Sequence, residues 1–351
     1  MTVSTLDPNE PPEAPGRPSI APAAPRKTRR RLMSALRASV TLGAFAWLAS
    51  RIDFTDLVRA FARLDATAVA LAVAISFVTL FVGTVRWRLL LEAYGAERHI
   101  PLSMLFRLYL IGGFYNTYVP GGVGGDLLRG VATRAAFGDD RVASTTGALS
   151  IVFVERVYGL VGMLVVSALA SLIWPLPGVP DMSLWALGGV VVAVGVVVAL
   201  GLAPRLSNLL PGVIGRILAA LPRPRDPWRF LGVFALSVLT HGLVGLTGHV
   251  IMRVLVPGLP VTSSLVIVPL AAASAFFPLT VGGAGVREAA FVALYGLVGV
   301  GKATAIAGSL TFWATQLIVA AVGGVVAVVS PVRAEDVLAC AVERSSKLTE
   351  P

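Results

Sequence analysis

Long apolar segments alternate with short polar ones from about residue 32 to residue 330. A transmembrane helix needs about 20 consecutive, predominantly apolar residues, and six of these segments approach or exceed that length. The pattern therefore predicts an all-α polytopic membrane protein with six or more transmembrane helices. The six predicted spans are 32–50, 67–85, 143–173, 183–202, 230–256 and 302–329.

Two further apolar stretches, 102–138 and 262–299, are each interrupted by a Gly-Gly-x-Gly core. Glycine lets the backbone leave helical geometry. Such a break at membrane depth is tolerated only where protein buries it or a wet cavity borders it. We therefore interpret both stretches as re-entrant helical hairpins. The glycines of the two cores are Gly121, Gly122 and Gly124, followed by Gly282, Gly283 and Gly285.

The first hairpin has an alternative interpretation, in which residues 102–119 cross the membrane completely. That crossing would place Arg129, Arg134 and Arg141 outside the cell. Arginine-rich loops concentrate on the cytoplasmic side of a membrane, so the arginine distribution favours the hairpin.

The same charge rule orients the whole chain. Residues 1–31 are a Pro- and Arg-rich tail, and residues 331–351 are a short polar tail. We expect both termini to be cytoplasmic, because basic residues beside the spans concentrate there. In this orientation the predicted transmembrane domain 32–330 contains two inverted repeats, 67–173 and 230–329. Inverted repeats with broken helices recur in transporters.

Two short segments carry signals of the membrane interface. Residues 54–64 place their apolar side chains on one helical stripe, which predicts an amphipathic helix at the outer interface. The sequence Arg86-Trp87-Arg88 follows the second predicted span. Arginine and tryptophan together are typical of an anchor at the membrane surface, and we expect the span to end there.

The composition fits a membrane protein and excludes other classes. Hydrophobic residues make up 56% of the chain and charged residues 14%, which is too apolar for a soluble domain. The net charge of +10 comes largely from basic residues beside the spans, and these favour anionic membrane lipids as partners. No basic face is interleaved with aromatic residues, so we expect no nucleic-acid binding.

The chain also lacks the common signatures of enzymes. A single cysteine, Cys340, allows neither an intramolecular disulfide nor a cysteine metal cluster. The phosphate-binding loop of ATPases and the Gly-x-Ser-x-Gly turn of hydrolases are both missing from the sequence. We therefore expect no ATP hydrolysis, no catalytic residue, no cofactor and no bound metal.

Charged residues within these apolar stretches are the candidate lipid site, because intramembrane charge is costly and usually faces a bundle interior or a wet cavity. Glycine amides and arginines could bind a lipid phosphate, while carboxylates engage a cationic group or a proton. A structural ion network that fixes the hairpins is the other interpretation, and both can hold together. The candidate residues are Asn116, Asp126, Arg129, Glu155, Arg156, Arg287 and Glu288, with the six glycines named above.

Glu155 and Arg156 are adjacent in the span 143–173. Adjacent side chains on a helix point about 100° apart, so each of these two needs its own partner. We expect one net-neutral cavity that gathers three arginines and three carboxylates, and such a cavity suits a zwitterionic or anionic lipid headgroup. The partners available are Arg129 or Arg287 for Glu155, and Asp126 or Glu288 for Arg156.

His241 and His249 lie in the span 230–256, and Arg253 falls on nearly the same stripe. Two histidines without a third ligand are weak evidence for a metal site. Polar packing in the core is one interpretation, and a proton relay is the other, since histidine titrates near neutral pH. Gln316, in the last span, is expected to make a hydrogen bond between helices.

At three places the chain resembles the flippase-like membrane family typified by the transmembrane region of lysylphosphatidylglycerol synthetases. These are Asn116 to Arg129, Glu155-Arg156 inside a span, and Pro278 to Glu288. The resemblance covers roughly residues 30–330. It implies a helical bundle with re-entrant segments that moves lipids between leaflets. It carries a lipid-site role onto Asp126, Arg129, Glu155, Arg156, Arg287 and Glu288.

Full-length synthetases of this kind add a large soluble domain that transfers lysine to the lipid. This chain shows no such domain after its last span, so we expect no lysine transfer here, and the resemblance does not fix the substrate.

These observations lead to the expectation of an ATP-independent lipid flippase or transporter in a bacterial plasma membrane. The alternative is a lipid-binding membrane scaffold that supports enzymes of envelope synthesis, and a lipid-modifying enzyme ranks third. For a transporter, we expect Arg129→Ala to abolish transport with folding largely intact. Arg156→Ala should abolish transport and lower the folding yield as well.

Overall fold

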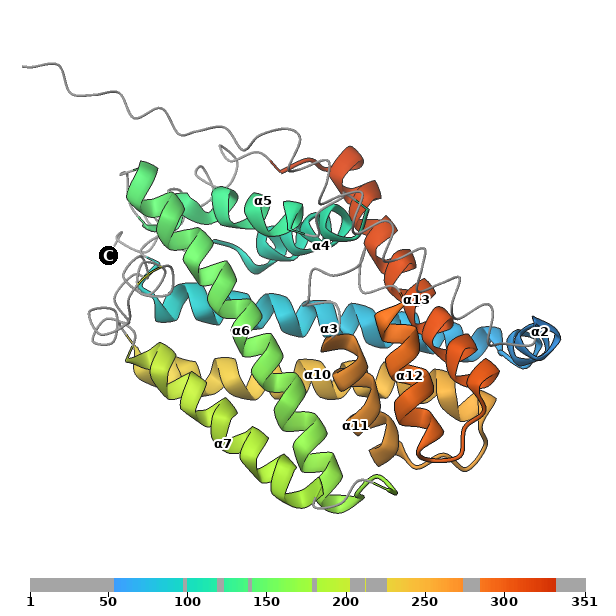
Figure 1. Ribbon diagram of the computed structural model, residues 1–351. Coiled ribbons are helices and arrows are strands. Elements are labelled where there is room, and N and C mark those ends of the chain that lie inside the picture. The colour runs from blue at the N-terminus through green and yellow to red at the C-terminus, as the bar shows by residue number, and fades with distance from the viewer. Residues whose placement is uncertain are drawn as a thin grey trace, which may run out of the picture. The chain divides into compact units, whose positions relative to one another are not determined.

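The computed structural model describes residues 54–96, 100–118, 123–137, 141–178, 182–202, 212, 226–273 and 285–332. The chain separates into two compact units, residues 1–36 and 37–351, and every described residue belongs to the second. All regular elements of these ranges are helices (Figure 1). The predicted span 32–50, residues 1–31 and 333–351, and the core glycines Gly121, Gly122, Gly282 and Gly283 lie outside the described residues.

Four helices of the described part are long and apolar enough to cross a membrane. They confirm the helices predicted at 67–85, 143–173, 230–256 and 302–329. A fifth helix, α7 (Met182–Gly201), forms where another span was predicted, although it is not among these four. The four long helices are α3 (Ala66–Ala93), α6 (Arg141–Ile173), α10 (Pro227–Leu255) and α13 (Lys302–Val329).

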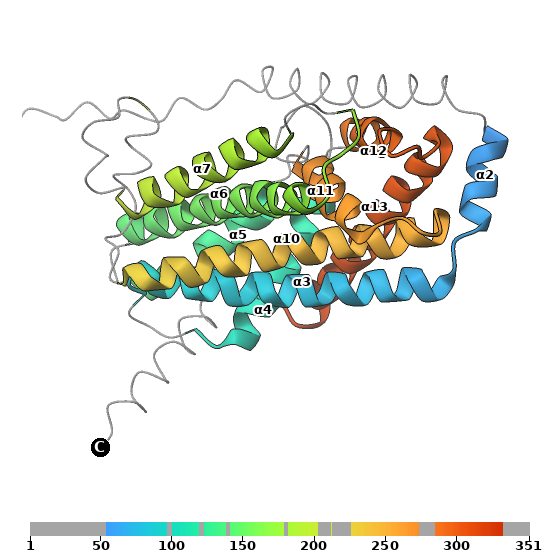
Figure 2. The same ribbon diagram turned by 90° about the horizontal axis from the view of Figure 1, so that it is seen from below.

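The helices α3 and α10 lie side by side and run in opposite directions (Figures 1 and 2). Both begin at an aspartate that accepts a hydrogen bond from a backbone amide two residues on, from Thr67 to Asp65 and from Trp228 to Asp226. Aspartate is a preferred N-cap residue because it satisfies an amide that has no partner within the helix. The capping residues therefore fix where each of these helices starts.

Two pairs of short helices connect the long ones. The first pair is α4 (Leu102–Tyr118) and α5 (Gly124–Thr133), which continues into the 3-10 turn η1 (Arg134–Phe137). The second pair is α11 (Val261–Ala272) and α12 (Val286–Gly296). The helices of each pair pack against each other.

These short helices are shorter than the apolar thickness of a membrane. The 10 residues of α5 span about 15 Å, which is half of the roughly 30 Å of bilayer hydrocarbon. The order long, short, short, long occurs twice, as α3–α4–α5–α6 and as α10–α11–α12–α13. That the two halves are inverted repeats stays a prediction.

Glycines set the closest approach between α4 and α5. A Cβ atom added at Gly125 would lie 1.8 Å from the carbonyl oxygen of Gly112. The two backbones are therefore so close at this point that no side chain fits between them. Gly112 also leaves room for the Arg129 side chain, whose Cδ and Cγ would lie 3.2 Å from an added Cβ. The glycine pair therefore places Arg129 directly against α4.

The helix α2 (Phe54–Ala62) confirms the predicted amphipathic helix. In Figure 2 it lies crosswise at the end of α3, and it also contacts α13. Its apolar residues Phe54 and Val58 are exposed, while Asp56 and Arg59 form an exposed ion pair of 3.0 Å. A crosswise helix with exposed apolar side chains has the form of a helix that lies in a membrane interface.

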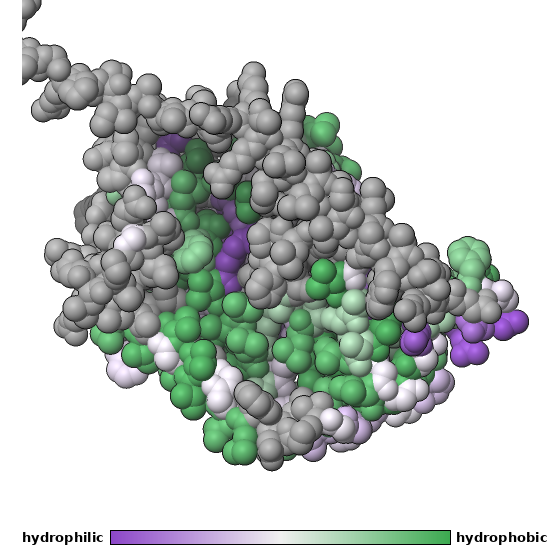
Figure 3. Space-filling model, viewed as in Figure 1, coloured by the Kyte–Doolittle hydropathy of each residue, from purple (hydrophilic) through white to green (hydrophobic). Residues whose placement is uncertain are grey.

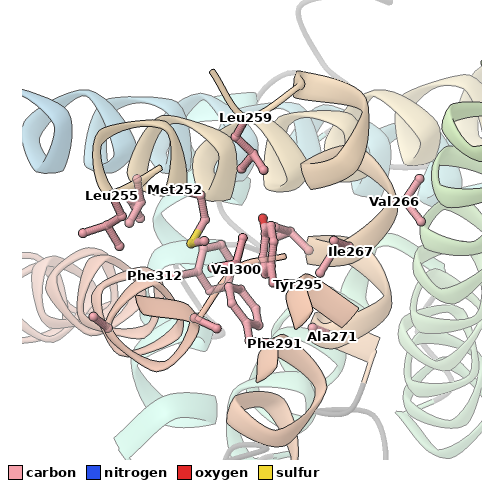
Figure 4. Close-up of a cluster of buried hydrophobic side chains, with 14 of the residues drawn as sticks. Met252, Leu255, Leu259, Val266, Ile267, Ala271, Phe291, Tyr295, Val300 and Phe312 are labelled. Atoms are coloured by element: carbon pink, nitrogen blue, oxygen red, sulfur yellow. The ribbon is translucent and has the colours of Figure 1, made fainter. Parts of the chain in front are cut away.

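Buried apolar residues form two main clusters, one around α3, α4 and α6 and the other around α10 to α13. In the second cluster, side chains from four helices meet (Figure 4). Hydrophobic residues also dominate much of the outer face in Figure 3, as a lipid environment favours. The residues labelled in Figure 4 include Met252, Ile267, Phe291, Tyr295 and Phe312.

Candidate functional site

The carboxylate of Glu155, on α6, is the meeting point of four helices. It is buried, with 2% of the residue exposed. Its Oε1 accepts hydrogen bonds from Arg86 Nη2 at 3.1 Å and from the Tyr109 hydroxyl at 2.9 Å. Its Oε2 accepts from Arg129 Nη1 at 2.9 Å. Because these donors come from α3, α4 and α5, one side chain ties the first hairpin to both flanking long helices.

Asp126, at the start of α5, is the second buried carboxylate. Its Oδ1 accepts from Arg129 Nη2 at 2.8 Å and from Asn116 Nδ2 at 3.0 Å, and its Oδ2 pairs with Arg156 Nε. The Asn116 side chain also accepts a hydrogen bond of 2.9 Å from the Gly125 amide. Asn116 therefore closes the N-terminus of α5 and orients Asp126 at the same time.

Arg129 joins the two carboxylates through different nitrogens of one guanidinium. Its Cζ also lies 4.9 Å from the ring centroid of Trp87 and 4.5 Å from that of Tyr109. A cation over an aromatic face is stabilised by the ring quadrupole, and more strongly where water is excluded. Arg129 is thus held on all sides. We call Arg86, Asp126, Arg129, Glu155 and Arg156 the Glu155 network.

Two predicted pairings are confirmed, Arg129 with Glu155 and Arg156 with Asp126. The predicted interface anchor at Arg86-Trp87 is wrong. The helix α3 continues to Ala93, and both Arg86 and Trp87 are buried in the protein. The apolar run Leu89-Leu90-Leu91 after the arginines was the signal that the helix goes on.

The Glu155 network carries three arginines and two carboxylates, which sum to a formal charge of +1. Its arginines differ in exposure, since 36% of the Arg156 side chain is exposed against 7% for Arg86 and for Arg129. Arg156 is therefore the most exposed arginine of the network.

The second motif forms a group of its own on α12. Glu288 accepts hydrogen bonds from Arg287 Nε at 3.0 Å and Nη2 at 2.5 Å, and from Ser309 Oγ at 3.2 Å. Arg287 also lies over the Trp313 ring, at 5.4 Å from its centroid. The Glu155 network, which has an excess of positive charge, therefore does not match the predicted net-neutral set of three arginines and three carboxylates.

Two glycine amides at the two motifs, those of Gly125 and Gly285, already have partners. The Gly285 amide donates to Glu288 Oε2 at 2.5 Å, in a capping box at the start of α12. Gly285 has a φ of +85°, a conformation that favours glycine. In the first motif, the amide of Gly125 donates to Asn116. An anion that bound these amides would have to displace the internal acceptors.

The two span histidines occupy different surroundings. His249 Nδ1 lies 3.3 Å from Ser264 Oγ, which also accepts a 3.0 Å hydrogen bond from the Tyr295 hydroxyl. His241 is buried beside Gly162, and neither of its ring nitrogens has a hydrogen-bond partner in the described part of the chain. The interhelical hydrogen bond expected of Gln316 is present, from Nε2 to Ser76 Oγ at 3.3 Å.

No group of three or more His, Cys, Asp or Glu side chains in the described ranges could hold a metal ion. The site residues that sequence reasoning missed are Arg86 and Tyr109, both of which bond Glu155. Tyr109 gave no sequence signal, because it lies within an ordinary apolar run.

Membrane-length helices around a buried, charged interior define a multi-pass helical membrane protein. The chain belongs to the family described as the transmembrane region of lysylphosphatidylglycerol synthase, whose model matches residues 34–324. The resemblance found in the sequence is thereby confirmed. A comparison with curated proteins found no match. Membership relates the chain to proteins of lipid modification or transport.

Proposed function

We propose that the protein moves a phospholipid or another lipid-linked anion between the two leaflets without ATP hydrolysis. The observation that carries this proposal is the Glu155 network, in which three arginines face two buried carboxylates. Intramembrane charges are expensive and typically mark substrate or ion pathways, and a buried ion pair is by itself weak evidence of a stabilising role. A partly exposed arginine in a network with excess positive charge suits a phosphate, which arginine binds through charge-assisted hydrogen bonds.

The arrangement of helices supports a transport mechanism. The antiparallel course of α3 and α10 and the repeated order of helices agree with two inverted repeats. In such transporters the site lies near the midplane, between broken helices of both halves. The pairs α4–α5 and α11–α12 take the place of these broken helices, as re-entrant hairpins that enter from opposite faces. Alternating access would move one repeat against the other around the network.

We also propose that the chain is not an enzyme and acts in a bacterial plasma membrane, with both termini in the cytoplasm. Ser264 and His249 have the separation of a nucleophile and a base. Ser264 is completely buried, however, and its Oγ accepts from Tyr295. A lipid ester cannot approach an oxygen that is enclosed in this way.

The test is a leaflet-accessibility assay in proteoliposomes that contain this protein alone. Fluorescent phospholipids are placed in both leaflets, and a membrane-impermeant quencher is added outside. Without transport, only the outer-leaflet fluorescence is lost. The wild-type protein should remove the protected fraction, Arg156→Gln should leave it largely protected, and Arg59→Gln should behave like the wild type.

Arg59 is the matched control, because its exposed ion pair lies on α2, outside the network. If no anionic lipid moves although the reconstituted protein is folded, the transport proposal fails. The alternative, a lipid-binding scaffold for enzymes of envelope synthesis, would then be favoured.

A further inference from the structure

All three buried carboxylates in the described part of the chain are already surrounded by internal donors. Glu155 accepts from Arg86, Arg129 and Tyr109. Asp126 and Glu288 also accept at least three hydrogen bonds each, from the Arg129, Arg156 and Asn116 side chains and from Arg287, Ser309 and the Gly285 amide. A carboxylate has about four lone-pair positions, so little acceptor capacity is left over.

The hairpin tips add no further acid. Residues 119–122 and 274–284, which connect the short helices, contain neither Asp nor Glu in the sequence. An ammonium group that entered from either hairpin would therefore compete with an arginine for Asp126, Glu155 or Glu288. Arginine wins such a competition, because its planar fork donates several hydrogen bonds from fixed positions.

The charge balance points in the same direction. The Glu155 network has three arginines and two carboxylates, a formal charge of +1. A phosphodiester lipid such as phosphatidylglycerol, with one negative charge, brings the total to zero, and a polyprenyl phosphate, a monoester of about −1.5 to −2 at pH 7, brings it slightly below zero. A lysyl-modified phosphatidylglycerol, with one phosphate and two ammonium groups, raises the total to +2. Like charges repel strongly where water is excluded.

We propose that the site selects lipid phosphates without a cationic group and discriminates against aminoacylated headgroups. This inference rests on the proposed transport function, and it names the substrate class of the same site. Two sources share the favoured chemistry, glycerophospholipids such as phosphatidylglycerol and polyprenyl phosphates. Zwitterionic headgroups should be intermediate, because their ammonium cancels the phosphate charge but needs a carboxylate of its own.

The experiment compares four fluorescent lipids in the leaflet assay: phosphatidylglycerol, a polyprenyl phosphate, phosphatidylethanolamine and lysyl-phosphatidylglycerol. In parallel, the thermal stability of the purified protein in detergent is measured with short-chain forms of the same lipids. At least one anionic lipid should move at least about tenfold faster than the lysyl lipid. A tenfold ratio corresponds to about 1.4 kcal/mol of discrimination. The same anionic lipid should also stabilise the protein more.

A second variant tests the cause of the selectivity. Arg156→Gln removes one positive charge and one donor to Asp126, so the preference for anionic over lysyl lipid should shrink in the stability measurement. Lysyl lipid that moves as fast as the anionic lipids, or faster, overturns this inference while leaving the transport function in place. If no lipid moves, the transport function fails, and equal or greater stabilisation by lysyl lipid then overturns the inference independently.

Discussion

Arg86 Nη2 lies 3.1 Å from Glu155 Oε1, although 69 residues separate the two in the sequence. The same arginine reaches Ser237 Oγ on α10 at 3.4 Å. Arg86 therefore connects three long helices, α3, α6 and α10, and it links the two predicted repeats. A structural change that moves one repeat against the other has to break or slide this contact.

Replacing Arg86 with alanine should destabilise the protein by about 3–5 kcal/mol, because removal of one partner leaves a buried charge uncompensated. Unfolding by a denaturing detergent in mixed micelles measures this free energy. Arg59→Ala is the control, since the exposed Arg59–Asp56 pair should contribute less than about 1 kcal/mol. Equal effects of the two substitutions would show that the Arg86–Glu155 pair does not stabilise the fold.

Arg156→Gln should separate transport from stability. Asp126 keeps Arg129 and Asn116 as donors, so the free energy of unfolding should fall by only about 1–2 kcal/mol. Transport should fall by about tenfold or more, because a charge-assisted hydrogen bond to an anion is worth about 1.5–3 kcal/mol. Initial rates of leaflet exchange, normalised to folded protein, measure the effect, and an unchanged rate would remove Arg156 from the lipid site.

The structure reverses the order of severity that the sequence predicts for Arg129 and Arg156. Arg129 is enclosed by two carboxylates and two aromatic rings, so Arg129→Ala should impair folding. Arg156 is the partly exposed member of the network. Sequence spacing places both residues near the same site, but it does not reveal how α5 and α6 pack, and this packing decides the burial of Arg129 and of Arg156.

Local signals in the sequence predicted much of the fold. Apolar runs of membrane length predicted the positions of α3, α6, α10 and α13, and their glycine-interrupted neighbours predicted the short helix pairs. Opposite charges at a shared site also predicted two of the ion pairs. These features depend on residues that are close in sequence or on charge balance, both of which one sequence contains.

The role of Arg86 could not be recognised in the same way. An arginine at the end of an apolar run is typical of an interface anchor. Only the packing of α3 against α6 shows that Arg86 is buried. The internal partners of two glycine amides could not be predicted for a related reason. Asn116 and Glu288 compete for the amides of Gly125 and Gly285, and this competition arises from tertiary contacts or from a cap, not from the glycine pattern.

Gly125 and Gly124 should respond very differently to alanine. At Gly125 the added Cβ would meet backbone, 1.8 Å from Gly112 O, whereas at Gly124 the nearest atom is 3.9 Å away on Tyr115. Gly125→Ala should therefore force α4 and α5 apart and cost about 1–3 kcal/mol or more, with loss of transport. Gly124→Ala should be neutral or slightly stabilising, since alanine favours helix. Unfolding of both variants by a denaturing detergent measures the two changes in stability. An unchanged free energy of unfolding for Gly125→Ala would refute the tight packing of α4 against α5.

The hydrogen bond from Tyr295 to Ser264 should couple α12 to α11. Both side chains are fully buried, so Tyr295→Phe should cost about 1–2 kcal/mol by leaving a buried oxygen with one partner fewer. A double-mutant cycle with Ser264→Ala isolates the contact, and its coupling energy should be about 0.5–1.5 kcal/mol. A coupling near zero would mean that the two hydroxyls do not stabilise each other.

The single cysteine gives a direct test of the proposed orientation. Cys340 follows the last span, and a cytoplasmic C-terminus predicts that a membrane-impermeant maleimide labels it in inside-out vesicles but not in right-side-out vesicles. Cys340→Ser removes the background, and Pro177→Cys on that background reports the opposite side, because Pro177 is exposed just after α6. Labelling of Cys340 from the outside would invert the topology, and with it the face from which each hairpin enters the membrane.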